Sequence, residues 1–210
     1  QELKDKLLPA VNSAIDPENG KNISNPYLAG LDYYKKEDFN KAAEEFRKAF
    51  NAFPKIKDYS LNYLFRMHKL RGEYDECKKD YEILVREFPQ SRWIEECMYS
   101  MGEIYFKQGK WKESVKSFYE FNKKFPRSNF ISNSFFKMGL SFAAFGEKDR
   151  AKEVFTFLWL YYPWTYESKE AENYLKENIY KVKTLEDIVP PSELLIRAKK
   201  LFEVGRFRES

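Results

Sequence analysis

The sequence predicts an all-α fold, a superhelix (solenoid) built from successive helical hairpins. The first observation is a repeat: Pro89, Pro126 and Pro163 are spaced 37 residues apart, and Pro54 lies 35 residues before Pro89. The second observation is composition, because 33% of the residues are charged, 18% are aromatic, and no apolar run approaches the ~20 residues of a membrane span. A repeat of this length is typical of stacked helical units.

Each proline is preceded by the same kinds of residue at fixed distances. Small residues lie 24 and 12 positions before it, aromatic residues 21 and 8 before it, and glycine 17 before it, with exceptions in single repeats. The small residues are Gly30, Gly102, Gly139, Ala42, Cys77, Ser114 and Ala151; the aromatic residues are Tyr33, Tyr105, Phe142, Phe46, Tyr81, Phe118 and Phe155; the glycines are Gly72, Gly109 and Gly146. This agreement disfavours the alternative of unrelated helices that share a proline by chance.

Each repeat is expected to hold two helices, such as residues 94–107 and 112–125 of the third repeat. Gly109 lies between these two stretches and supplies the positive φ that the turn requires. Two helices approach to ~8–10 Å only where the residues at their crossing are small, so Gly102 is expected to face Ser114. The proline then ends the second helix, because it lacks a backbone N–H.

The second repeat departs most from this pattern. Phe65 occupies a position that holds a small residue in the other repeats, and His68 occupies an aromatic position. We therefore expect the two helices of this repeat to splay or shift locally. His68 itself is expected to be a packed, hydrogen-bonded imidazole.

The repeats divide the chain into three parts. Residues 1–25 predict a short helix and a loop, which form an N-terminal cap or tether, and residues 26–166 hold four repeats. Residues 167–210 predict C-terminal helices and the start of a fifth repeat, in which the matching positions are Ala198, Leu201, Gly205, Phe207 and Ser210. Because this repeat stops midway, we expect the chain to be a piece of a longer protein.

Five aromatic residues gather at the end of the fourth repeat. They are Trp159, Tyr161, Tyr162, Trp164 and Tyr166. This number exceeds what one helix seam needs, so we expect them to cover the following helix, around residues 171–180, or a partner.

The two cysteines leave two interpretations open. Cys77 occupies a small buried position of the second repeat, and Cys97 lies on the first helix of the third repeat. The two could be neighbours across the repeat junction. Free buried cysteines are the favoured interpretation, because Ala or Ser fills the Cys77 position in other repeats.

The sequence lacks the residue patterns of catalysis and of cofactor binding. Its one histidine and two cysteines do not match a nucleophilic triad or a zinc site, and its glycines occur singly, not in a phosphate-binding loop. The basic residues are scattered and the net charge is only +4, which disfavours nucleic-acid binding. We expect no enzyme activity, no cofactor, no metal, no nucleic acid and no transmembrane segment.

The order of small residue, aromatic residue, turn, Ala-x-x-x-Phe and closing proline resembles the tetratricopeptide repeat. This resemblance implies a right-handed superhelix whose first helices line a concave groove that binds a protein partner. Carried over by register, the implied contact residues are Tyr27, Leu31, Tyr34, Asn62, Arg66, Lys69, Tyr99, Glu103, Phe106, Phe136 and Leu140. An equally weighted alternative is that some of these aromatic side chains pack between repeats or against the N-terminal segment.

The best-known peptide site of this family is the carboxylate clamp of co-chaperones, which uses Lys and Asn at set positions. The matching residues here are Tyr27, Leu31, Asn62, Arg66, Tyr99 and Glu103. The clamp is therefore absent. An aromatic groove with Arg66 and Glu103 as polar contacts suits an extended or helical segment with apolar anchors.

The repeat junctions carry a second resemblance. Phe88-Pro89-Gln90-Ser91 and its equivalents are similar to the junctions of bacterial envelope tetratricopeptide proteins, including the outer-membrane assembly lipoprotein, the Tol-Pal coordinator and the N-terminal superhelix of soluble lytic transglycosylases. It implies an interaction scaffold or adaptor of the periplasm or cell envelope, with a lipid anchor upstream as an option. The alternatives are the non-catalytic superhelical arm of a peptidoglycan lytic transglycosylase and, for location, the cytoplasm. Oligomeric state and partner identity do not follow from the sequence.

Overall fold

The structure, a computed structural model, describes residues 25–205, and over this range it contains only helices and the turns that join them. The helices are α2 (Pro26–Lys35), α3 (Phe39–Ala52), a 3-10 turn (Pro54–Ile56), α4 (Lys57–Leu70), α5 (Tyr74–Glu87), α6 (Ile94–Lys107), α7 (Trp111–Lys124), α8 (Ile131–Ala144), α9 (Lys148–Tyr161), α10 (Tyr166–Tyr174), a π-helix (Leu175–Tyr180) and α11 (Pro191–Glu203). The predicted all-α fold of helical hairpins is confirmed. The helix and loop expected within residues 1–24 lie outside the described residues.

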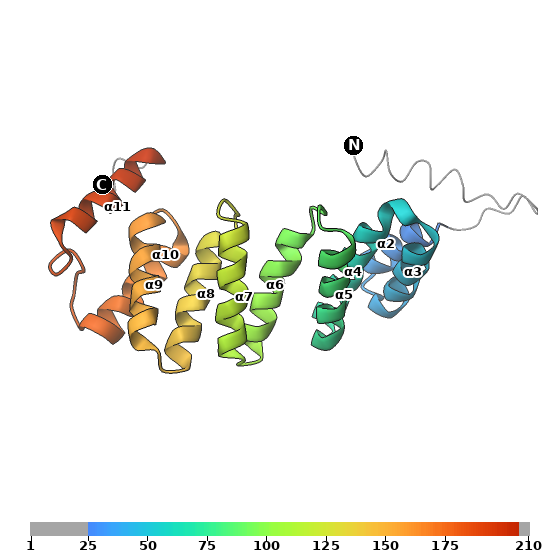
Figure 1. The fold of residues 1–210 in the computed structure, drawn as a ribbon, viewed down its shortest axis with the longest axis horizontal. Helices are drawn as coiled ribbons and strands as arrows, with labels where there is room; N and C mark the ends of the chain where they lie inside the picture. The colour runs from blue at the N-terminus through green and yellow to red at the C-terminus, as the bar shows by residue number, and fades with distance from the viewer. Residues whose placement is uncertain (1–24, 206–210) are drawn as a thin grey trace, which may run out of the picture. The chain divides into compact units, whose positions relative to one another are not determined.

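The chain divides into two compact units, Gln1–Cys97 and Met98–Ser210, with the boundary inside α6. In unit 1, α3 packs between α2 and α4, and α4 also packs against α5. In unit 2, α8 packs between α7 and α9, while α10 and α11 both contact α9, and Figure 1 shows α7, α8 and α9 side by side. Below, α2, α4, α6, α8 and α10 are called the first helices and α3, α5, α7 and α9 the second helices.

The glycines at the hairpin crossings make room for an aromatic ring. A Cβ atom added to Gly102 would lie 2.6 Å from the Phe118 ring, and one added to Gly139 would lie 2.6 Å from the Phe155 ring. Ser114 also meets Gly102 as expected, because its hydroxyl donates to the Gly102 carbonyl at 3.4 Å. The small residue and the aromatic residue of the first, third and fourth repeats are therefore partners in one contact.

The hairpin turns have the backbone conformation that the glycines predict. Gly72, Gly109 and Gly146 have φ angles of 73°, 68° and 93°. Glu37 takes the same place in the first hairpin with φ of 60°. A residue with a Cβ atom is strained there by about 1–2 kcal/mol, a cost that the glycine turns avoid.

The second repeat keeps its crossing closed, so of the two expected departures, splaying or a local shift, splaying is not seen at this point. The Cys77 thiol lies 3.6 Å from the Phe65 carbonyl oxygen, against 3.4 Å for the equivalent contact of Ser114 and Gly102. Phe65 is buried, whereas Tyr81, whose equivalents in the other repeats are fully buried, is only half-buried. The large ring of this crossing therefore comes from the first helix and not from the second.

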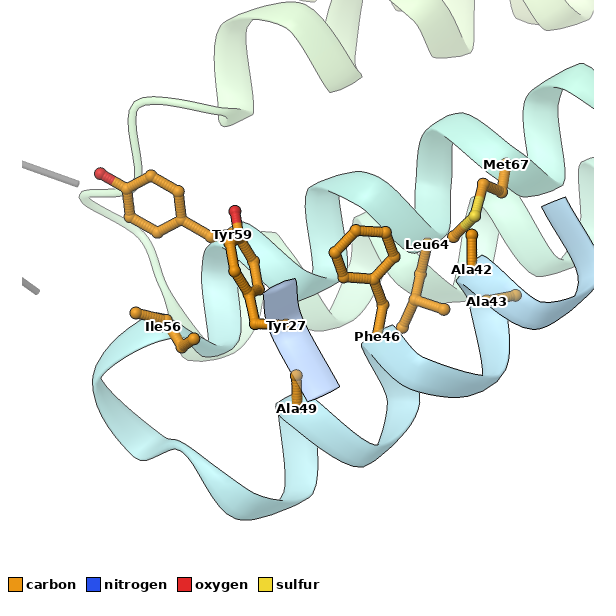
Figure 2. Close-up of a cluster of buried hydrophobic side chains, with 9 residues drawn as sticks. All are labelled: Tyr27, Ala42, Ala43, Phe46, Ala49, Ile56, Tyr59, Leu64 and Met67. Atoms are coloured by element: carbon orange, nitrogen blue, oxygen red, sulfur yellow. The ribbon is translucent and has the colours of Figure 1, made fainter. Parts of the chain in front are cut away.

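Unit 1 has its own apolar core, in which α2, α3 and α4 meet. Figure 2 shows Tyr27 of α2 beside Phe46 of α3, and the two ring centroids are 5.4 Å apart with the planes at 71°. The buried members of this core are Tyr27, Ala42, Ala43, Phe46, Ala49, Ile56, Tyr59, Leu64 and Met67. Asn25 is the N-cap of α2, the helix that carries Tyr27, and its Oδ1 accepts from the Tyr27 backbone N–H at 2.9 Å.

The aromatic cluster at the end of the fourth repeat covers the following helix in part. Trp159 is fully buried in the same core as Ala171 and Leu175, and its indole N–H donates to Glu172 at 3.2 Å. Tyr166, in contrast, leaves 72% of its surface exposed. The covering role expected for this cluster is thus confirmed for Trp159 and not for Tyr166.

The start of the expected fifth repeat is helical. Leu201 in α11 is buried, and Gly205 follows the helix with φ of 76°, as in the other hairpin turns. The matching positions Phe207 and Ser210 lie outside the described residues.

Candidate interaction site on the first helices

The predicted contact residues lie on the first helices, but they differ in exposure. Tyr27, Asn62 and Tyr99 are buried, at 0%, 1% and 7% exposed. The remaining predicted residues are half-buried: Leu31, Tyr34, Arg66, Lys69, Glu103, Phe106, Phe136 and Leu140. Partner binding by these residues remains a prediction, and the two units are described in turn.

In unit 1 the predicted residues gather around Tyr63, which sequence reasoning missed. The Tyr63 ring lies edge to face with Tyr34 at 5.3 Å and with Tyr27 at 6.1 Å, and it stacks on Phe46 at 4.6 Å. Burial raises the pKa of the Tyr63 hydroxyl above its ordinary value, and Arg66 opposes that shift. Tyr63 directly follows a predicted contact residue, so only the three-dimensional structure shows that its ring turns into the cluster.

Arg66 is the charged group at the edge of this cluster. Its guanidinium lies 5.7 Å from the ring centroids of both Tyr63 and Trp93, and it donates to the Glu96 carboxylate at 2.6 Å. Burial lowers the Arg66 pKa, but the hydrogen bond and the charge of Glu96 outweigh it, so the net pKa is raised. The guanidinium is therefore charged and held between two aromatic faces.

Several buried hydrogen-bond donors of unit 1 have no acceptor within residues 25–205. They are the Asn25 Nδ2, the Tyr27 hydroxyl, the Ser60 hydroxyl, the Asn62 Nδ2, the Arg66 Nε and the Trp93 Nε1. Arg66 contacts Trp93 and influences the pKa of the Tyr27 hydroxyl, which is raised mainly by burial. A buried donor without an acceptor costs about 1–3 kcal/mol, so these groups destabilise unit 1 unless acceptors reach them.

In unit 2 the side chains around Tyr99 pair with one another, although the buried Ser168 hydroxyl on α10 has no partner within residues 25–205. The Tyr99 hydroxyl donates to Asn133 Oδ1 at 2.6 Å, and the Asn133 amide donates to Glu167 at 3.1 Å. Lys137 forms an ion pair with Glu103 and donates to the Tyr99 hydroxyl at 3.3 Å. Burial, followed by the charge of Glu103, raises the Tyr99 pKa. Tyr99 and Glu103 are thus engaged within the chain.

A sequence signal for this network exists at a spacing shorter than the repeat. The pairs Tyr99–Asn133, Asn133–Glu167 and Glu103–Lys137 all join residues 34 apart, one helical turn less than the 37-residue period. Neighbouring first helices therefore meet at this offset. A search for complementary side chains 34 residues apart would have found the network.

Removing one hydroxyl from each unit is expected to change stability in opposite directions. Tyr27→Phe should raise the free energy of unfolding by about 1 kcal/mol, because it removes a buried hydroxyl that has no partner. Tyr99→Phe should lower it by about 1 kcal/mol, because it leaves Asn133 without its donor. Urea unfolding of both variants measures the difference. Equal destabilisation by both changes would show that the Tyr27 hydroxyl has a partner.

The single histidine belongs to a buried polar contact in unit 1. His68 Nδ1 donates to Asp80 at 2.6 Å, and the Arg47 guanidinium lies 3.3 Å from His68 Nε2. Because arginine only donates, Nε2 accepts, and this arrangement assigns the neutral tautomer that carries its proton on Nδ1. Burial raises the Asp80 pKa, and the hydrogen bond from His68 opposes the shift. The predicted packed, hydrogen-bonded imidazole is confirmed.

The cysteines are free and buried, as the favoured interpretation predicted. Burial raises the pKa of the Cys77 thiol to about 12 and also raises that of Cys97. Both are therefore protonated thiols near neutral pH and not nucleophiles. Within the described part of the chain, no group of three His, Cys, Asp or Glu side chains could hold a metal ion.

Comparison with known protein families identifies the repeats. Residues 96–128 and 133–163 match the family model described as Tetratricopeptide repeat. The chain contains tetratricopeptide repeats. Among curated protein sequences, no relative matches the chain. Tetratricopeptide proteins are generally scaffolds that bind other proteins through the surfaces of their stacked hairpins.

Two solved structures share the fold at low sequence identity. Two structures from Podosopora anserina, both described as nearly identical TPR-like repeats of a kinesin light chain, align with this chain at 13% and 12% identity. Their TM-scores are 0.55 and 0.51. They cover 84% and 85% of this chain and 95% and 87% of their own. A tetratricopeptide repeat protein from Parabacteroides merdae aligns at 17% identity with a TM-score of 0.48, over 86% of this chain and 73% of its own.

None of the helices described between residues 25 and 205 is both long and apolar enough to span a membrane.

Proposed function

We propose that this tetratricopeptide protein is an interaction scaffold of the bacterial cell envelope that binds an extended segment of a partner protein on the first helices of unit 1. The observation that carries the binding proposal is the set of buried donors without acceptors on Tyr27, Asn62, Arg66 and Trp93. The envelope location rests on the resemblance of the proline junctions to those of envelope proteins.

An extended segment fits this face chemically. Its backbone carbonyl groups are acceptors, and acceptors are what the unpaired donors of unit 1 lack. The rings of Tyr34 and Tyr63, which are half-buried, offer apolar contact to the side chains between those carbonyls. In unit 2 the Tyr99 network already pairs its own polar groups, so unit 1 is the favoured site of the two.

The test begins with short random peptides displayed on phage and selected on the full chain. For the selected peptides, Trp93→Phe and Arg66→Lys should each weaken binding about tenfold, since each removes one unpaired donor. Trp93→Phe keeps an aromatic ring at its position, and Arg66→Lys keeps a positive charge. Fluorescence anisotropy measures the dissociation constants. Circular dichroism confirms that the variants keep their helix content.

Matched controls make the same chemical changes elsewhere. Trp111→Phe alters an indole of unit 2, and Arg86→Lys alters an arginine of α5 that is 69% exposed. Both should change affinity by less than about twofold. Binding that is insensitive to Trp93 and Arg66 overturns the proposal, and loss on Phe106→Ala alone would move the site to unit 2.

A further inference from the structure

Unit 2 has a cleft lined by α7, α8 and α9, and none of its lining residues belongs to the predicted contact residues described above. The cleft has a volume of about 390 Å³ and lies between α7 and α9, with α8 as its floor. A volume of this size is in the range that holds a ligand or several side chains of a partner. Nothing in the function proposed above uses this cleft.

The wall formed by α7 is one continuous helix face. Lys112, Val115, Lys116 and Tyr119 recur at the spacing of one face, and all four line the cleft. Tyr119 leaves 58% of its surface exposed, although it is a large aromatic residue. This wall therefore alternates basic and apolar contacts along its length.

The floor and the opposite wall are mainly apolar. Met138 and Phe142 of α8 lie at the base, and Val154 of α9 lies across from α7. Phe142 and Val154 are only half-buried, so their apolar surface is open to the cleft. Such surface is stabilised when an apolar side chain covers it.

The charges around the cleft are unbalanced. Lys112 and Lys116 have no carboxylate within ion-pair distance among residues 25–205. Arg150 pairs with the exposed Glu147 at 3.7 Å, and its guanidinium lies 5.8 Å from the centroid of the Phe142 ring at the edge of the floor. Glu153 is the one acidic side chain that lines the cleft. The basic groups thus face solvent beside an apolar floor, and this arrangement is complementary to an acidic ligand with an apolar anchor.

We propose that this cleft binds an acidic segment of a partner protein, with an apolar side chain seated on Phe142, Met138 and Val154 and carboxylates beside Lys112 and Lys116. Met138 and Val154 are aliphatic, and an aliphatic surface favours a protein side chain over a nucleic-acid base, which binds mainly by stacking on aromatic rings. The cleft is lined by α7, α8 and α9, and it shares no residue with the proposed site of unit 1.

The test uses the full chain and a fluorescein-labelled helical peptide in which glutamate and leucine recur at helical spacing. Lys112→Glu/Lys116→Glu should weaken its binding at least about tenfold, because two attractive charges become repulsive. A peptide with lysine in place of each glutamate should bind the unaltered chain at least about tenfold more weakly. Lys112 lies in the first turn of α7, where glutamate is favourable to the helix, so the variant should remain folded.

Lys123→Glu/Arg127→Glu is the matched control, because both residues are exposed and neither lines the cleft. It changes the net charge by the same amount and should alter affinity less than about twofold. Equal weakening by both double variants would mean attraction by total charge only and would overturn the proposal. Failure of the acidic peptide to bind, or equal binding of the basic peptide, would also overturn it.

Methionine methyl signals locate the bound peptide. The chain has four methionines, and only Met138 lines the cleft. In spectra of the chain labelled with ¹³C at its methionine methyl groups, the Met138 signal, identified by Met138→Leu, should shift on addition of the acidic peptide. The signals of Met67, Met98 and Met101 should stay in place. A shift of these three without Met138 would place the peptide elsewhere and overturn the proposal.

Discussion

Replacing His68 with leucine is expected to lower the free energy of unfolding by about 3 kcal/mol. The imidazole donates to Asp80 at 2.6 Å, and Asp80 is only 8% exposed, so its carboxylate would lose a donor where water does not reach it. Burial already raises the Asp80 pKa, which shows how unfavourable its charge is there. Urea unfolding at neutral pH measures the loss.

A double variant separates the lost contact from a general packing defect. His68→Leu/Asp80→Leu should recover most of the loss, because an apolar pair needs neither donor nor acceptor. The coupling energy from the cycle of four proteins then reports the His68–Asp80 contact itself. If the double variant is less stable than His68→Leu alone, the carboxylate is not the source of the loss.

Replacing Gly139 with alanine is expected to cost about 2 kcal/mol net. The added Cβ atom would lie 2.6 Å from the fully buried Phe155 ring, and overpacking of this kind typically costs 1–3 kcal/mol or more. The opposing gain in helix propensity is about 1 kcal/mol. Thermal melts followed by circular dichroism measure the net effect.

The control for Gly139→Ala changes the ring that it meets. In a Phe155→Leu background the alanine should cost much less, because leucine leaves room beside the helix. Gly30→Ala should be milder than Gly139→Ala in the parent chain, since its Cβ atom would lie 3.0 Å from the Phe46 ring. A Gly139→Ala variant that melts above the parent would show that Phe155 moves aside freely.

Much of the fold could be predicted from residue spacing. The turn glycines Gly72, Gly109 and Gly146 marked three hairpin turns, and the structure gives each of them a positive φ. Only a backbone without a Cβ atom adopts that conformation readily, so the residue type reveals the turn. Glu37 holds the same conformation without glycine, and its sequence carries no local sign of the turn.

The second repeat shows where spacing misled. A large residue at the Phe65 position predicted helices that splay or shift locally. In the structure the helices stay close, with Tyr81 only half-buried and the Phe65 ring buried at the crossing. A core tolerates such an exchange when the total volume is preserved. The side-chain volume at a crossing comes from both helices together, whereas a single repeat position gives the residue on only one of them.

The candidate site was predicted in part. The register placed Tyr34, Arg66 and Tyr99 on the first helices, and the structure agrees. It did not distinguish Tyr99, which donates to Asn133, from Arg66, whose Nε has no acceptor in the described residues. Tyr99 and Arg66 occupy register positions four residues apart, on the same face of a first helix, so their partners on the next first helix make the difference.

Residue spacing along the chain was enough to define the helices, their turns and the small positions at their crossings, because glycine, proline and small residues act on the backbone around them. Contacts between helices settled the rest: the neutral tautomer of His68, the closed network of Tyr99, and the open cleft beside Lys112 and Lys116. A hydrogen bond or an ion pair forms only within about 3–4 Å. Such distances depend on how helices some 30 residues apart are packed, which no local pattern contains.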